Sequence, residues 1–80
     1  MDLQVISVAQ LRSHLRSLRK MQKITQTQLG RRVGLSQSRI GKIERDPARV
    51  SAGELLRVLT ALDVLVVLRT ASDEDHKSSR

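Results

Sequence analysis

The stretch TQTQLGRRVGLSQSRIGKIER, residues 25–45, decides the fold of the chain. Thr25 and Ser36 are of the residue types that cap helix N-termini, and each precedes a short segment with the apolar spacing of a helix. Gly34 separates the two segments, at a place where glycine tolerates the positive φ that follows a helix end. We therefore predict two short helices, over residues 26–33 and 37–44.

Small and aliphatic residues recur in this stretch at the spacing that two closely crossing helices need. Gly30 lets the two backbones approach, and aliphatic side chains fill the angle between the helices. These aliphatic residues are Leu29, Val33, Leu35, Ile40 and Ile43. The pattern is that of a helix-turn-helix, a motif whose second helix enters the major groove of DNA.

The chain has 80 residues, a net charge of +7 and an isoelectric point near 11.4. This length allows one small domain, with a limited core that self-association would help to stabilise. The positive charge favours an anionic partner, which is expected to be nucleic acid when the charge accompanies a DNA-binding motif. Because the chain has no aromatic residue to stack on unpaired bases, we predict double-stranded DNA.

Residues that support catalysis or metal binding are scarce. The chain has no cysteine, and its two histidines, His14 and His76, lie far apart in sequence. No paired carboxylates, serine–histidine–aspartate set or phosphate-cradling glycine loop is visible. We therefore predict that the protein is not an enzyme and has no cofactor and no metal.

The sequence also contains no segment that predicts a membrane or secreted protein. No apolar run approaches the roughly 20 residues that span a bilayer. The N-terminus lacks the basic stretch and apolar core of a secretion signal. We expect a cytoplasmic protein associated with the bacterial nucleoid, with no membrane partner.

Helical patterns flank the central motif on both sides. Ser7 can cap a helix with apolar residues at Val8, Leu11, Leu15, Leu18 and Met21 or Gln22. Asp46 and Pro47 then break the pattern. Ser51 and Glu54 predict a capping box for a further helix ending near Asp63. Its expected inward residues are Leu55, Leu56, Val58, Leu59 and Leu62.

Five consecutive apolar residues follow this helix, namely Val64, Leu65, Val66, Val67 and Leu68. Their β-branched content favours a short strand over about 64–69. A lone strand has no partner in a helical bundle, whereas the same strand of a second copy would supply the missing hydrogen bonds. We predict a mainly α domain over residues 1–70, a homodimer closed by this strand, and a disordered tail over 71–80.

Candidate DNA contacts cluster at the start of the two central helices. Side chains in the first turn of the second helix should meet base edges, because glutamine can bond adenine, arginine can bond guanine and serine can bond either. These candidates are Ser36, Gln37, Ser38 and Arg39. Gln26 could bind phosphate at a helix N-terminus, as could Lys42 further along. Arg31, Arg32, Arg45 and Arg49 could add backbone contacts; the alternative for all of these residues is a solvated surface role.

Glu44 is an acidic residue at the end of the second central helix, where it would repel phosphates unless it were paired. Arg19, late in the first helix, is a suitable partner. We predict a structural ion pair between Arg19 and Glu44 that ties these helices together. An exposed, unpaired glutamate is the alternative.

The residues TQTQLGRRVGLSQSRIGKIERDP resemble the helix-turn-helix of the Cro and lambda-repressor superfamily, often called XRE type, and the similarity extends over roughly residues 8–62. The resemblance implies a lambda-repressor-like bundle of four to five helices. It also implies a phosphate contact by Gln26, groove contacts by residues 37–39 and a bridge between the predicted Arg–Glu pair. Gly30 and Gly41 depart from the usual residues, and each could cost up to about 1 kcal/mol against alanine.

The helix over 51–62 and the apolar segment that follows it are similar to HipB-type antitoxins, in which such a strand pairs between subunits. The resemblance implies a dimer that represses its own operon at a palindromic operator. It further implies that the protein binds and neutralises a HipA-like serine/threonine kinase toxin. Two alternatives stay open: a stand-alone repressor without a toxin, and a protein-interaction module that no longer binds DNA.

Overall fold

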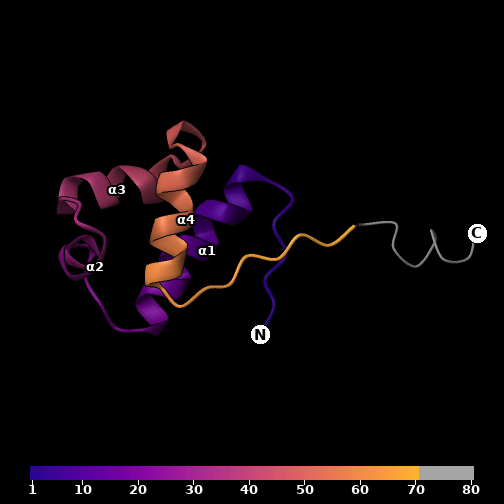
Figure 1. The fold of residues 1–80 in the computed structure, drawn as a ribbon, viewed down its shortest axis with the longest axis horizontal. Helices are drawn as coiled ribbons and strands as arrows, with labels where there is room; N and C mark the ends of the chain where they lie inside the picture. The colour runs from indigo at the N-terminus through magenta and orange to yellow at the C-terminus, as the bar shows by residue number, and fades with distance from the viewer. Residues whose placement is uncertain (71–80) are drawn as a thin grey trace, which may run out of the picture.

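The computed structural model describes residues 1–70, and these form a helical bundle (Figure 1). The predicted tail at 71–80 lies outside the described residues. The elements are α1 (Val8–Met21), α2 (Gln26–Val33), α3 (Gln37–Arg45), the 3₁₀ turn η1 (Pro47–Arg49) and α4 (Ala52–Ala61). The predicted mainly α architecture is confirmed. Within the described range, no helix is both long and apolar enough to cross a membrane.

Each helix begins where a hydroxyl side chain caps it. The side chains of Ser7, Thr25, Ser36 and Ser51 each accept a hydrogen bond from the backbone N–H three residues later. Gly34 ends α2 with φ of 74°, in the left-handed region that favours glycine. These local signals explain why the predicted helix starts agree with the structure.

The capping box predicted at the start of α4 is only half formed. Ser51 Oγ accepts from the backbone N–H of Glu54, at 3.1 Å. The carboxylate of Glu54, however, accepts hydrogen bonds from the guanidinium of Arg39. A charged donor makes a stronger hydrogen bond with a carboxylate than a neutral backbone N–H does, so this part of the prediction was wrong.

The hydrophobic core lies between the four helices. Its buried residues are Leu15, Leu29, Val33, Ile40, Ile43, Val58, Leu59 and Leu62. Three residues expected to face inward do not, since Val8, the first residue of α1, is 49% exposed, Met21 is 61% exposed and Leu56 is 48% exposed. In α4 the inward stripe is formed by residues spaced three and four apart, and Leu56 falls on a neighbouring face. In α1 the half-buried Gln22 takes the place of Met21 and donates to the carbonyl of Leu62.

Gly30 marks the closest approach between α2 and the turn that follows it. The N–H of Leu35 donates to the carbonyl of Gly30 at 2.8 Å. A Cβ atom on residue 30 would lie closer than 3.0 Å to the carbonyl oxygen of Leu35, a distance that real structures essentially never show. The expectation that alanine would be the more stable residue here is therefore wrong, because steric overlap outweighs helix propensity.

We expect Gly30→Ala to lower the free energy of unfolding by about 1 to 3 kcal/mol, since the backbone around Leu35 must shift. Gly53→Ala is the matched control, because a Cβ there meets nothing within 4 Å. That control should raise stability by up to about 1 kcal/mol. Urea denaturation followed by circular dichroism measures both changes. A Gly30→Ala variant as stable as the unmodified protein would contradict this account of the turn.

The apolar segment after α4 runs out from the bundle (Figure 1). No strand is assigned anywhere in residues 1–70 of this single chain. Val64 remains attached, because its N–H donates to the carbonyl of Leu59 at 2.9 Å. The next four apolar side chains are between 46% and 96% exposed. Strand pairing across a dimer needs a second copy, and it stays a prediction.

Candidate nucleic-acid interface

Helix α3 presents a polar face that is opposite its buried face. Ile40 and Ile43 point into the core, whereas Ser38, Lys42 and Arg45 are exposed. These three exposed residues are spaced four and three apart, so they form one outward stripe. The stripe carries two cations and no acid, which suits an anionic surface.

Gln37, at the start of α3, is held by a hydrogen bond to Gln26 at the start of α2. The Nε2 group of Gln37 donates to Oε1 of Gln26, and Nε2 of Gln26 donates to Oε1 of Glu44 at 3.2 Å. The Glu44 carboxylate can only accept hydrogen bonds. The Gln26 amide must therefore direct its NH₂ group toward Glu44. The oxygen of Gln26 is thereby directed toward Gln37.

Glu44 also forms the ion pair with Arg19 that the sequence predicted. Arg19 donates to both carboxylate oxygens through Nε and Nη2, and its Nη1 donates to the carbonyl of Ile24 at 3.0 Å. The side chains are 2% exposed for Glu44 and 12% exposed for Arg19. This buried pair therefore anchors the Gln26–Gln37 hydrogen bond to α1.

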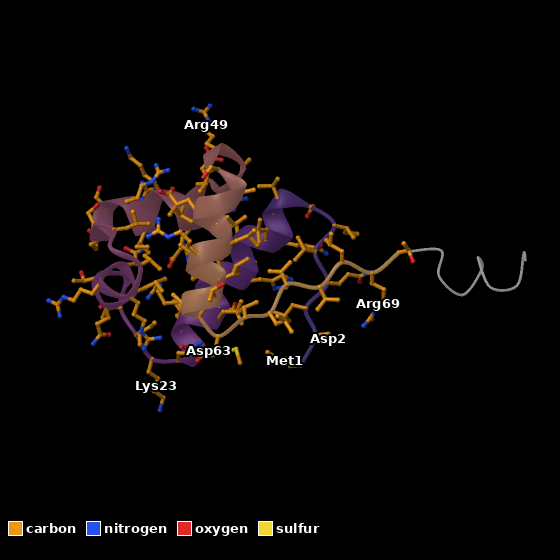
Figure 2. The ribbon with its side chains drawn as sticks, in the orientation of Figure 1. Met1, Asp2, Lys23, Arg49, Asp63 and Arg69 are labelled. Atoms are coloured by element: carbon orange, nitrogen blue, oxygen red, sulfur yellow. The ribbon has the colours of Figure 1, made fainter. Side chains whose placement is uncertain are left out.

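The N-terminus of α2 opens into a shallow hollow of about 530 Å³, lined in part by Lys20 and Lys23. Lys23 projects from the α1–α2 turn (Figure 2). Among the described residues, no acceptor is assigned to the backbone N–H groups of Gln26 and Thr27. Free N–H groups at the positive end of a helix, with cations beside them, favour an anion. Lys20 and Lys23 were not predicted from the sequence as anion contacts, although their position just before the N-cap of α2 was a usable signal.

Arg39 lies on the flank of α3 that faces α4. Its Nε donates to Oε1 of Glu54 at 2.9 Å, and its Nη2 donates to the same oxygen. The Arg39 side chain is 39% exposed and the Glu54 side chain 20% exposed. Arg39 was predicted to meet base edges, and the structure shows that it is already engaged within the protein.

The other predicted cations are spread over the surface. Arg32 donates to the carbonyl of Ala61 at 3.1 Å, so its guanidinium lies at the C-terminal end of α4 and away from the first turn of α3. Arg31 is exposed on the outer face of α2. Arg49 pairs with Asp46 and projects from the opposite end of the bundle from Lys23 (Figure 2). Contacts to DNA by these residues, and by Ser36, stay predictions.

A protein family described as helix-turn-helix matches residues 15–66, a range that contains α2, α3 and α4. The chain belongs to the helix-turn-helix family. Its arrangement of helices is of the XRE type, which is the fold of DNA-binding transcriptional regulators. Among residues 1–70, no group of three or more metal-ligating side chains comes together.

One curated relative is an uncharacterized HTH-type transcriptional regulator, y4dL, of Sinorhizobium fredii (strain NBRC 101917 / NGR234). It is 44% identical over 54 residues, which are 68% of this chain. The match spans 28% of the relative's own length. The chain therefore corresponds to less than a third of that relative.

The fold is similar to solved structures of HipB. A complex of a HipB variant with an O2 20mer matches with a TM-score of 0.81 and 22% identity, over 89% of this chain and 99% of that chain. A structure of a HipA–HipB–O2–O3 complex matches with a TM-score of 0.78 and 22% identity, over 85% and 96%. The HipB-like fold expected from the sequence is thus confirmed.

Proposed function

We propose that the protein is a dimeric repressor that binds a palindromic operator in double-stranded DNA, with α3 in the major groove. The observation that carries this proposal is the hydrogen bond between Gln26 and Gln37, anchored on buried Glu44. It fixes a glutamine side chain at the N-terminal end of α3, next to the exposed cationic stripe. This is the end of a recognition helix that approaches base edges.

The Gln26 bond leaves Gln37 able to bind one kind of base. A glutamine amide has two N–H donors and one oxygen acceptor, and Gln26 uses one of the donors. The remaining N–H and the oxygen form a donor–acceptor pair. Adenine offers the complementary pair, N7 and the N6 amino group, in the major groove. Gln37 is therefore proposed to bind adenine.

The hollow at the N-terminus of α2 supports a phosphate contact. Both the side-chain oxygen and one N–H of Gln26 are used inside the protein. A phosphate would instead meet the free backbone N–H groups of Gln26 and Thr27, with Lys20 and Lys23 beside it. Lys42 and Arg45 would meet phosphates from the exposed face of α3.

Replacing Gln37 with alanine should remove discrimination for adenine at one position of each half-site. We expect a loss of about 1 to 3 kcal/mol per half-site on the selected operator and little change on a random duplex. Gln4→Ala, which removes an exposed amide from the N-terminal segment, is the matched control. Fluorescence anisotropy with the two duplexes measures the difference. Equal affinities of the Gln37→Ala variant and the unmodified protein for the selected operator would contradict the adenine contact. Failure of the unmodified protein to bind either duplex would favour a protein-interaction module that does not bind DNA.

We further propose that the repressor is an antitoxin that binds a HipA-like serine/threonine kinase. Two observations support this role: the similarity of the fold to HipB, including the HipB of a HipA–HipB–O2–O3 complex, and the exposed apolar segment after α4. The test is co-expression with the kinase-like product of a neighbouring reading frame. We expect a stable complex in size-exclusion chromatography and restored cell growth. A toxic kinase that neither binds the protein nor is neutralised would contradict the antitoxin role.

A stand-alone repressor without a toxin is the second candidate. The name of the Sinorhizobium relative, a transcriptional regulator, favours it. This candidate makes the same prediction for Gln37 and differs only in the neighbouring genes. A genomic neighbourhood without a kinase-like reading frame would favour it over the antitoxin.

A further inference from the structure

We infer that Glu54, on α4, is a positioning residue that sets the base specificity of Arg39 on α3. This inference rests on the proposed DNA-binding function and adds to it a residue outside α2 and α3. The two side chains join the first turns of α3 and α4, and both hydrogen bonds from Arg39 go to a single oxygen, Oε1 of Glu54.

The backbone fixes both ends of this pair. Arg39 is the third residue of α3, and its N–H donates to the capping Ser36 at 3.0 Å. Glu54 is the third residue of α4, and its N–H donates to the capping Ser51 at 3.1 Å. Because both residues sit in capped helix turns, their Cα positions are set, and the pair holds the long Arg39 side chain in one direction.

The atoms that Glu54 engages determine what Arg39 can still bind. A guanidinium has five N–H donors in one plane, and Glu54 takes Nε–H and one N–H of Nη2. The other N–H of Nη2 and its neighbour on Nη1 form a free edge of two parallel donors. Such an edge matches the two acceptors of guanine, O6 and N7, in the major groove. Glu54 thus presents Arg39 in the form that bonds guanine.

The negative charge of Glu54 also favours specific over non-specific DNA binding. It neutralises Arg39 locally, and a carboxylate near the DNA surface repels phosphates. Attraction of Arg39 to any duplex is therefore reduced, while the directional contact with one base remains. Affinity for random DNA comes from phosphate neutralisation. Glu54 should therefore raise the ratio of the affinity for the operator to the affinity for random DNA.

The flanks of α3 are consequently held in similar ways. Gln37 is fixed from α2 through Gln26, and Arg39 is fixed from α4 through Glu54. Between them lies the exposed stripe that begins at Ser38. Gln37 and Arg39 would contact bases on either side of this stripe. Gln37 would bind adenine and Arg39 would bind guanine.

The test is a double-mutant cycle of Glu54→Gln and Arg39→Ala on the full chain. It is measured with the selected operator, with the operator changed at its guanine positions and with a random duplex. We expect Glu54→Gln to reduce discrimination at one guanine position by about tenfold. The Glu54→Gln variant should bind the random duplex more tightly than the unmodified protein does. The plot of its log affinity against log salt concentration, the salt slope, should be steeper by about 0.9 per protomer. In the Arg39→Ala background, Glu54→Gln should leave guanine discrimination unchanged.

Asp46→Asn is the control for charge alone, because Asp46 is an exposed acid at the end of α3 that pairs with Arg49. It should change the salt slope but not the discrimination at guanine. Unchanged discrimination in Glu54→Gln, or an equal loss in the Arg39→Ala background, would overturn the inference and leave the proposed DNA-binding function standing. An unmodified protein that prefers no operator over random duplex would overturn both.

Discussion

Replacing Glu44 with alanine is expected to lower the free energy of unfolding by about 3 to 5 kcal/mol. The reason is that Arg19, which is only 12% exposed, would keep its charge away from water without its partner. Gln26 would lose the acceptor that orients its amide. Because small domains are stabilised by only about 5 to 15 kcal/mol, this loss would remove a large share of the total stability and lower the midpoint of thermal unfolding.

The matched control removes an acid of the same kind from the surface. Asp46 pairs with Arg49, and their side chains are 53% and 87% exposed. Asp46→Ala should therefore change stability by no more than about 1 kcal/mol. Thermal and urea unfolding of both variants give the comparison. Similar losses of unfolding free energy in Glu44→Ala and Asp46→Ala would show that the buried Arg19–Glu44 pair does not stabilise the fold.

Removing the apolar segment is the second change with a large expected effect. A chain that ends at Val64 keeps the hydrogen bond from Val64 to the carbonyl of Leu59 and loses the exposed apolar residues after it. We expect this chain to be monomeric. We further expect it to bind a palindromic operator about 100 to 10,000 times more weakly, because the second half-site is no longer bound by the same molecule.

A chain that ends at Thr70 is the control, since it retains the segment and lacks only residues 71–80. It should remain a dimer with operator affinity close to that of the full chain. Sedimentation velocity and anisotropy measure the two properties. A dimer of unchanged strength in the chain ending at Val64 would exclude the predicted strand pairing.

The helices could be predicted from the sequence because their limits depend on local chemistry. Ser7, Thr25, Ser36 and Ser51 each satisfy backbone N–H groups within the following turn, so a cap is visible without knowledge of the fold. The Arg19–Glu44 pair was predictable for a related reason. An acid beside a DNA-binding surface needs a cation, and the helical patterns placed only a few cations within its reach.

The pairs that join α4 to the other helices could not be predicted in the same way. Glu54 had a local role available, in a capping box, and its actual partner Arg39 lies 15 residues away in the sequence. Arg32 and Arg57 each donate to a carbonyl at the end of the other's helix, Ala61 and Val33 respectively. Such contacts depend on how the helices cross, and neither charge nor periodicity specifies that.

Backbone geometry accounts for the remaining differences. Gly30 appeared replaceable by alanine when only helix propensity was considered, and the position of the Leu35 carbonyl reverses that conclusion. Lys23 and Asp63 adopt positive φ, at 57° and 60°, although neither is glycine. Both residues follow a helix end, where the chain must turn to begin the next segment.

The most direct test of the account is selection of binding sites from a pool of random DNA duplexes, performed with the unmodified protein and with Gln37→Ala. The account predicts an inverted repeat whose half-site centres lie about 34 Å apart, one turn of the double helix. It also predicts that one adenine in each half-site loses its enrichment with the variant. Selection of no repeat by the unmodified protein, or of the same adenines by Gln37→Ala, would contradict it.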